Sequence, residues 1–228
     1  MNGVVIVAAG SGSRMKMGIN KQFIKLNDKE IIAYTIDKFY NHDEINDIVI
    51  VIKKEEIEFF TTEIINKYNY KNIKIAYGGL QRQDSVYNGI KLLNEDCDLI
   101  LVHDGARPFI TNDIISNSIE EAKKNSAVVV GVPVKDTIKI INENNEIIDT
   151  PNRSQLWAVQ TPQTFKYDVL KKAYEDAFEC DFYGTDDAML VERIGYKVKM
   201  IEGSYNNIKI TTQEDLSVGS QILKEENQ

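Results

Sequence analysis

Short apolar runs alternate along this chain with segments in which apolar residues recur at helical spacing. An apolar run at residues 4–8 is followed by a helical pattern at 31–40 and a β-branched run at 47–52. The same rhythm predicts strands at 73–76, 99–102 and 127–132, and helices at 55–68, 83–93 and 111–124. Strands that are apolar on both faces and separated by helices are typical of a parallel sheet covered on both sides. We therefore predict a three-layer α/β fold with a mostly parallel sheet.

The alternation stops after Pro133. Two short strands are predicted at residues 136–141 and 146–149, joined by Asn142-Glu143-Asn144-Asn145, whose asparagines suit a tight turn. Beyond them the pattern predicts helices near 167–178, from 185 onward and near 212–224, and a strand at 197–201. Thr211 and Glu214 have the spacing of a capping box for the last helix. There is neither an internal repeat nor a linker, so we expect residues 1–228 to form one domain with a protruding β-hairpin arm.

The charge balance argues against a general binder of duplex nucleic acid. The chain carries 27 basic and 35 acidic side chains, a formal net charge of −8, whereas such a protein presents a basic face. Cys97 and Cys180 form no CxxC pattern and have no partnering histidine nearby, so neither a disulfide framework nor a zinc site is encoded. We expect a reducing, cytoplasmic location. The first apolar run is too short for a signal peptide or a membrane span, so we expect neither export nor a membrane anchor.

A glycine-rich turn, Ala8-Ala9-Gly10-Ser11-Gly12-Ser13-Arg14-Met15, follows the first predicted strand. Open parallel sheets bind ligands at such strand ends. The dinucleotide fingerprint fails because Met15 replaces a glycine and Lys53 stands where an acid is needed, and the P-loop spacing is missing. Exposed backbone N–H groups followed by Arg14 and Lys21 suit a polyphosphate instead. The alternative is an ordinary strand-to-helix turn with solvated basic residues.

Other polar clusters follow other predicted strands, and in a parallel sheet they converge on the same edge. The pair Gly78-Gly79 allows close approach to a planar base, to which Ser85 can hydrogen-bond. Mg²⁺ prefers one or two carboxylates together with phosphate oxygens, so Asp104 is a candidate metal ligand. Arg107 is a candidate fork for a phosphate or for the substrate. Alternatively, Asp104 only caps the next helix or pairs with Arg107.

Two further residues near these clusters allow opposite interpretations. Lys209 lies between isoleucines close to a predicted helix start, so it either binds an anion or extends its charged end to solvent. A single histidine in a strand-end loop, such as His103, is more often structural than catalytic, and we assign it no chemistry.

Seven segments carry a family resemblance: AAGSGSRM with NKQF, GGLQRQDSVYNGI, VHDGARPF, PVKDTIK, QTPQTF, TDDAML and NIKITTQEDL. Together, and in this order, they resemble the 2-C-methyl-D-erythritol 4-phosphate cytidylyltransferase family over nearly the full chain. The related ribitol-5-phosphate cytidylyltransferases share the fold and the reaction. Their strand-end motif is closer to DAVRP than to the HDGARP of this chain, so we favour the methylerythritol family.

The resemblance implies a Rossmann-like nucleotidyltransferase sheet and a homodimer in which residues 133–153 of one subunit hook over the other. It implies transfer of CMP from CTP to 2-C-methyl-D-erythritol 4-phosphate with Mg²⁺, a step of non-mevalonate isoprenoid biosynthesis. The implied catalytic residues are Arg14, Lys21 and Lys209. The implied nucleotide-binding residues are Ala8, Ala9, Gly10, Gly12, Gly78, Ser85 and Asp104, with Asp104 also binding the metal. The implied substrate-binding residues are Asp104, Gly105, Arg107, Thr161, Thr185 and Lys209, with Thr137 and Arg153 from the partner subunit.

The chemistry of the nucleophile explains why no base stands out in the sequence. A phosphate monoester has its second pKa near ~6 and is largely dianionic at neutral pH, so it needs no general base. Cations and a metal would then carry the catalysis by stabilising charge on the phosphates. Two other functions remain open: a ribitol-5-phosphate cytidylyltransferase, and a CTP-binding module of the same fold without catalysis.

Overall fold

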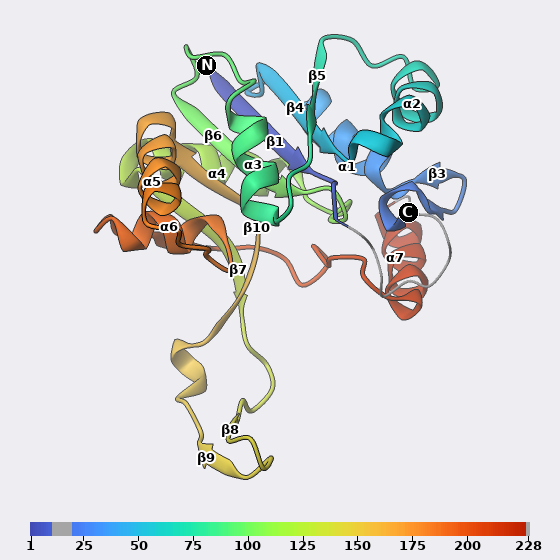
Figure 1. The fold of residues 1–228 in the computed structure, drawn as a ribbon. Helices are drawn as coiled ribbons and strands as arrows, with labels where there is room; N and C mark the ends of the chain where they lie inside the picture. The colour runs from blue at the N-terminus through green and yellow to red at the C-terminus, as the bar shows by residue number, and fades with distance from the viewer. Residues whose placement is uncertain (11–19, 227–228) are drawn as a thin grey trace.

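A seven-stranded sheet forms the centre of the computed structural model, which describes residues 1–10 and 20–226 (Figure 1). Its strands are β1 (Asn2–Val7), β4 (Asp47–Ile52), β5 (Ile73–Tyr77), β6 (Leu99–Asp104), β7 (Ala127–Pro133), β10 (Trp157–Lys166) and β11 (Lys199–Glu202). They lie in the order β11-β7-β10-β6-β1-β4-β5, and every neighbouring pair is parallel except the two pairs that involve β10. The predicted α/β class and mostly parallel sheet are confirmed.

Helices cover both faces of this sheet. One face packs against α1 (Ile31–Tyr40), α2 (Ile57–Phe60) and α4 (Asn112–Asn125), and the other against α3 (Arg82–Ile90), α5 (Tyr167–Glu179) and α6 (Asp187–Arg193). Successive side chains of a strand point to opposite faces, so in β1 Val4 and Ile6 enter the first core and Val5 enters the second. The predicted three-layer arrangement is therefore confirmed.

The last helix, α7 (Gln213–Glu226), packs beside these layers against a small hairpin of β2 (Lys25–Leu26) and β3 (Lys29–Glu30). Thr212 and Asp215 exchange hydrogen bonds at its start: the Asp215 carboxylate accepts from the Thr212 N–H at 2.9 Å, and the Thr212 hydroxyl accepts from the Asp215 N–H at 3.4 Å. The capping box predicted at Thr211 and Glu214 is thus wrong by one residue. Within residues 1–10 and 20–226, no helix combines the length and apolar character needed to cross a bilayer.

Strand β10 was not predicted, because its sequence WAVQTPQTFK mixes polar and apolar residues and contains a proline, which argues against a central strand. In the structure its buried polar side chains have partners. The Thr164 hydroxyl donates to Ser118 Oγ at 3.1 Å, and the Gln163 amide donates to the Asp186 carboxylate at 2.8 Å. Hydrogen-bonded side chains of this kind allow a strand to be buried without an apolar run.

The helix predicted at residues 55–68 consists of three consecutive segments of different helical type. In place of a continuous helix at residues 55–68, the structure has a 3₁₀ turn (Lys54–Glu56), α2 and a π-helical segment (Thr61–Asn66). A short 3₁₀ turn at Lys21–Phe23 precedes the β2–β3 hairpin.

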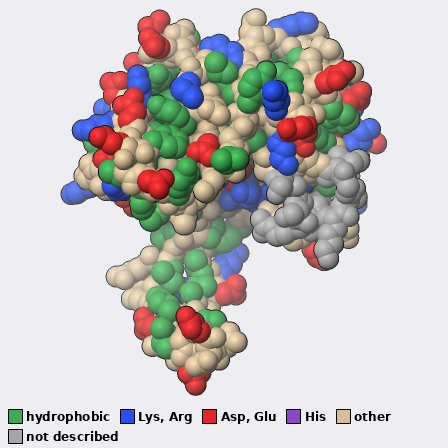
Figure 2. All heavy atoms as spheres, in the orientation of Figure 1, with side chains coloured by type: hydrophobic (Ala, Val, Ile, Leu, Met, Phe, Trp, Pro, Cys, Tyr) green, Lys and Arg blue, Asp and Glu red, His purple; other side chains and the backbone are tan. Residues whose placement is uncertain are grey.

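Residues 133–153 form an arm that projects away from the sheet (Figure 1). Its tip is a pair of antiparallel strands, β8 (Ile140–Ile141) and β9 (Ile147–Asp149), which are shorter than predicted. The Asn142 side chain accepts from the N–H groups of Asn144 and Glu146, and Asn145 has a φ of 62°, so the predicted asparagine turn is present. Figure 2 shows hydrophobic side chains on the surface of this arm, where Ile140, Ile141, Ile147 and Ile148 are all exposed. A 3₁₀ turn (Arg153–Gln155) leads from the arm back towards β10.

Candidate active site

A pocket of about 670 Å³ opens where β1 and β5 end, between residues 7–10 and 78–85; we call it the glycine-rich pocket. Gly78 lies so close to Ala9 that an added Cβ would come within 2.4 Å of the Ala9 Cβ, so this position requires glycine. The Ser85 hydroxyl accepts from the Gly79 N–H at 3.0 Å and donates to the Gln81 carbonyl at 3.0 Å, which fixes the turn. The structure thus brings Ala9, Gly10, Gly78 and Ser85 together.

A smaller pocket of about 100 Å³ adjoins it, and Gly10 and Arg82 line both. We call this one the Asp104 pocket, because it holds the last residue of β6 together with Ala8, Lys21 and Lys209. Gly12 and Arg14, predicted for nucleotide binding and catalysis, lie outside the described residues.

Three cations surround the Asp104 carboxylate. Lys209 Nζ lies 2.6 Å from Oδ2, Arg82 Nε lies 3.6 Å from Oδ1, and Arg107 Nε lies 3.9 Å from Oδ2. Burial alone would raise the pKa of Asp104, but Arg82 and Lys209 outweigh burial and hold the pKa well below its usual range. Asp104 is therefore ionised at any pH near neutrality.

The sequence position of Asp104 also allows two purely structural roles. A role in capping the next helix is wrong, because the Thr111 hydroxyl caps α4 by accepting from the Ile114 N–H. Pairing with Arg107 occurs, but it is the longest of the three contacts with cations.

Lys209 reaches Asp104 because its segment is bonded to the loop after β6. The Ile210 N–H donates to the Ala106 carbonyl at 2.8 Å, and the Arg107 guanidinium donates to the Asn207 carbonyl at 2.8 Å. The Asn207 amide in turn donates to the Thr161 carbonyl at 3.0 Å. These hydrogen bonds join three segments that are distant in the sequence, and they position Lys209 at the pocket.

Thr161 and His103 form a hydrogen-bond network with the backbone of Asp104. The Thr161 hydroxyl accepts from the Asp104 N–H at 3.1 Å and lies 3.0 Å from His103 Nδ1, while His103 Nε2 lies 3.1 Å from the Arg107 carbonyl. Burial lowers the pKa of His103 to about 4, so the imidazole is neutral near pH 7. A neutral ring that donates through Nε2 and accepts at Nδ1 satisfies this network, which agrees with the structural role expected for His103.

The other predicted substrate-binding residues are spread more widely. Gly105 is buried beside Asp104, and its N–H donates to the Val7 carbonyl at 2.9 Å. Thr185 is exposed just before α6. Thr137 and Arg153 lie on the arm, where the Arg153 guanidinium donates to the Lys135 carbonyl at 2.7 Å. The structure of one chain therefore does not bring the arm residues into either pocket.

Arg82 is a site residue that was not predicted from the sequence. Its guanidinium lines both pockets and donates to Asp187 at 2.8 Å. The available signal was an arginine within the glycine-rich segment that follows β5, but its partners come from β6 and α6 and could not be inferred from spacing.

A glycine-rich pocket beside a carboxylate surrounded by cations, at the carboxyl edge of a three-layer α/β sheet, is typical of an α/β protein that binds a nucleotide. The family model described as "IspD: 2-C-methyl-D-erythritol 4-phosphate cytidylyltransferase" matches residues 3–225. This chain belongs to that family, as the resemblance in its sequence indicated.

Individual relatives agree with the family match. A protein of Clostridioides difficile named 2-C-methyl-D-erythritol 4-phosphate cytidylyltransferase is 60% identical over 99% of this chain and 95% of its own length. One of the same name from Alkaliphilus oremlandii is 53% identical over 97% of this chain and 94% of its own length.

Solved structures show the same architecture. The crystal structure of 4-diphosphocytidyl-2C-methyl-D-erythritol synthase from Anaerococcus prevotii superposes with a TM-score of 0.87 at 35% identity, covering 98% of this chain and 96% of that one. The 2-C-methyl-D-erythritol 4-phosphate cytidylyltransferase of Francisella tularensis gives a TM-score of 0.83 at 31% identity, covering 96% and 98%.

Proposed function

We propose that this chain transfers CMP from CTP to 2-C-methyl-D-erythritol 4-phosphate, giving 4-diphosphocytidyl-2-C-methyl-D-erythritol and pyrophosphate in non-mevalonate isoprenoid biosynthesis. Membership of the family supports this reaction. The structural observation that carries it is the ionised Asp104 among Lys209, Arg82 and Arg107, next to a glycine-rich pocket. Such a site can hold a nucleotide and neutralise its phosphates in one place.

The acceptor phosphate attacks the α-phosphorus of CTP, and pyrophosphate leaves. Because the acceptor is already dianionic, the protein has only to bring two anions together and stabilise the charge that moves onto the phosphoryl oxygens. We assign this stabilisation to Arg14, Lys21 and Lys209. Ala8, Ala9, Gly10, Gly12, Gly78 and Ser85 would hold the nucleotide, and Gly105, Arg107, Thr161 and Thr185 the acceptor.

Asp104 suits Mg²⁺. The carboxylate is ionised, and it lines a pocket together with Lys21, Arg82 and Lys209, which are proposed to bind phosphate. Mg²⁺ commonly binds through one or two carboxylates, with substrate phosphates supplying other ligands. When bound, Mg²⁺ supplies positive charge that neutralises the phosphate oxygens. We propose Asp104 as its protein ligand.

The arm supports a proposal about assembly. Four exposed isoleucines on a projecting hairpin are typical of a surface that another protein covers. We propose that the chain is a single domain and that it forms a dimer through residues 133–153. Thr137 and Arg153 of the arm would then enter the partner's acceptor site. The free thiols of Cys97 and Cys180 fit a cytoplasmic location.

Pyrophosphate release, measured with Mg²⁺, CTP and either 2-C-methyl-D-erythritol 4-phosphate or ribitol 5-phosphate, tests the proposed reaction. A reaction without acceptor is the control. We expect turnover with the methylerythritol substrate alone. Turnover only with ribitol 5-phosphate would keep the chemistry and change the substrate, whereas CTP binding by calorimetry without turnover would indicate a nucleotide-binding module.

A further inference from the structure

The Arg82 guanidinium lies between two carboxylates that come from different elements. Arg82 is the first residue of α3; its Nη2 donates to Asp187 Oδ2 at 2.8 Å, and its Nε lies 3.6 Å from Asp104 Oδ1. Its side chain lines both the glycine-rich pocket and the Asp104 pocket, and 32% of the side chain remains exposed. Arg82 thus stands at the boundary of the two pockets and is accessible to a ligand.

Asp187 is a buried carboxylate that fixes the position of the Arg82 side chain. It opens α6, its side chain is 1% exposed, and its other oxygen accepts from the Tyr174 hydroxyl. Burial, reinforced by Asp187, raises the pKa of Tyr174 well above its usual value, so the phenol stays protonated and donates. A buried carboxylate is costly unless it is paired, and the charge partner that the structure gives Asp187 is Arg82.

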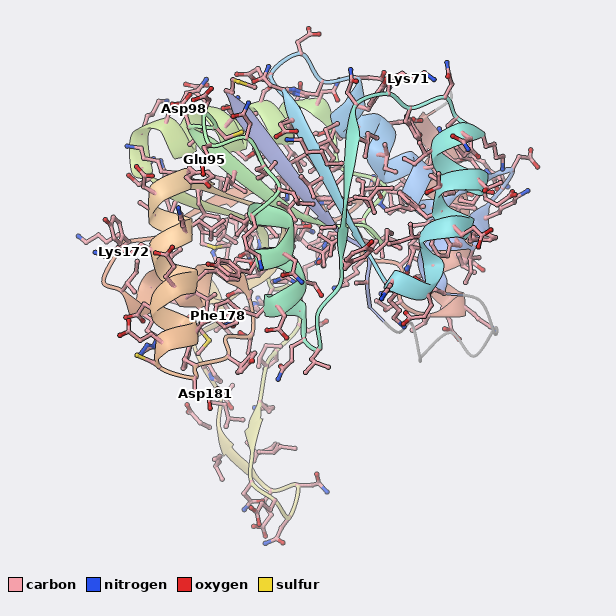
Figure 3. All side chains as sticks on the ribbon, turned by 45° about the horizontal axis from the view of Figure 1, so that its top comes forward. Lys71, Glu95, Asp98, Lys172, Phe178 and Asp181 are labelled. Atoms are coloured by element: carbon pink, nitrogen blue, oxygen red, sulfur yellow. The ribbon has the colours of Figure 1, made fainter. Side chains whose placement is uncertain are left out.

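The backbone around the pair is fixed by the neighbouring residue of α3. The Gln83 amide donates to the Phe182 carbonyl at 3.0 Å and accepts from the Gly184 N–H at 3.0 Å. Figure 3 labels Phe178 and Asp181 at the end of α5, and the Phe178 ring lies 5.0 Å from the Tyr87 ring of α3. The segment that leads to Asp187 is therefore held against the helix that carries Arg82.

The two contacts of Arg82 differ in kind. The bond to Asp187 is short and its carboxylate is buried, whereas the 3.6 Å contact with Asp104 is too long for a good hydrogen bond. Within the described part of the chain, the bond to Asp187 engages one of five N–H donors of the guanidinium. A guanidinium fork matches phosphate oxygens in charge and geometry, so a phosphate can replace the long contact while the bond to Asp187 stays.

We propose that Arg82 is a further phosphate-binding residue of this site, that it contacts the polyphosphate of the nucleotide, and that Asp187 is its positioning residue. The nucleotide is favoured over the acceptor because Arg82 also lines the glycine-rich pocket. This inference rests on the proposed function and adds a residue to its nucleotide site.

Arg82→Gln tests the binding role, with CTP and pyrophosphate titrated by calorimetry and turnover measured by pyrophosphate release. We expect Kd for CTP to rise about tenfold or more and kcat to fall about 10²-fold, the scale for losing a preorganised donor. The matched control is Arg193→Gln, which removes another arginine–aspartate pair, with Asp176 at 3.1 Å, outside both pockets. It should leave both values within twofold of the wild type. Arg82→Gln with unchanged CTP affinity and kcat would overturn the proposal.

Asp187→Asn tests positioning through non-additivity. Alone, it should lower kcat about tenfold while KM for the acceptor changes less than twofold, and in the Arg82→Gln background it should change kcat less than twofold. Equal losses in both backgrounds would mean that Asp187 is merely structural. If Asp187→Asn does not fold, Arg82→Lys keeps the charge beside Asp187 but removes the fork. It should then retain the wild-type Tm within a few degrees and still lose about tenfold in kcat.

The wild-type protein separates this inference from the proposed function. If the wild type binds CTP but turns over neither acceptor, the proposed reaction fails, while the comparison of CTP affinities still decides the role of Arg82. If the wild type turns over normally and Arg82→Gln behaves like Arg193→Gln, the inference alone fails.

Discussion

The Lys209 ammonium lies 2.6 Å from the Asp104 carboxylate. The cation proposed to bind phosphate is thus paired with the acid proposed to bind Mg²⁺. Phosphate binding by Lys209 and Mg²⁺ binding by Asp104, as proposed, would break this contact, which offsets the charge of the mostly buried Asp104 carboxylate.

Asp104→Asn should lower kcat by at least about 10²-fold and raise the Mg²⁺ concentration needed for half-maximal rate, because an amide binds Mg²⁺ less strongly than a carboxylate. The measurement is pyrophosphate release across a Mg²⁺ titration. Asp98→Asn is the control, since Asp98 pairs with the N-terminal ammonium at the opposite end of the sheet (Figure 3). An unchanged Mg²⁺ titration would contradict the assignment of Asp104.

Lys21→Ala should lower kcat roughly 10²–10³-fold, because Lys21 lines the Asp104 pocket and would stabilise charge in the transition state. Lys25→Ala, an exposed lysine on the next strand, serves as the control. A rise in KM for CTP with wild-type kcat would instead mean that Lys21 only binds the ground state.

Arg153→Ala should raise KM for the acceptor phosphate more than KM for CTP, because Arg153 is proposed to reach the partner's acceptor site. KM is measured for each substrate at saturating concentrations of the other. Lys139→Ala removes a second cation from the arm, where Lys139 Nζ contacts the Thr150 hydroxyl at 2.8 Å, and should change neither value. Equal effects of Arg153→Ala on both substrates would exclude this role.

Ile147→Lys should weaken self-association by at least about tenfold in Kd, since burying an isoleucine contributes about 1.5–3 kcal/mol and each copy loses one. Sedimentation across a micromolar concentration range measures it. Leu92→Lys, which changes an exposed apolar residue outside the arm, is the control. A wild-type protein that stays monomeric would remove the proposal that the arm forms a dimer.

Glu30→Gln should make the free energy of unfolding depend less on pH in the acid range. Burial alone would raise the pKa of Glu30, but hydrogen bonds from Lys67 at 2.7 Å and Tyr68 at 2.5 Å outweigh it and lower the pKa. A lowered folded-state pKa adds stability above the unfolded pKa, near ~4.3, and this stability is lost as the pH falls through the folded value. The free energy of unfolding, measured with urea at pH 7 and pH 3, should differ between wild type and variant, and this difference should be larger at pH 7. An equal difference at both values would contradict it.

The fold class followed from the chain because apolar runs report burial directly. The runs in β4 and β7 are apolar on both faces and need only a sheet to cover them. β10 escaped prediction because its burial depends on partners such as Ser118 and Asp186, which lie on other elements. The capping box was misplaced by one residue because Thr211 and Thr212 are adjacent and both suit the cap. In the structure the Asp215 carboxylate accepts from the N–H groups of both threonines, and the Thr212 hydroxyl accepts from the Asp215 N–H.

By itself, the sequence determined the α/β layers, the glycines that permit the close approach of Gly78 to Ala9, and the strand end that carries Asp104. Only the tertiary structure decided which charges meet: Lys209 with Asp104, and Arg82 with Asp187. The pattern of apolar residues that predicts burial can be read from the local sequence alone. A charge pair depends on distances between elements, and the packing of α3, α6 and residues 207–210 around the sheet sets those distances.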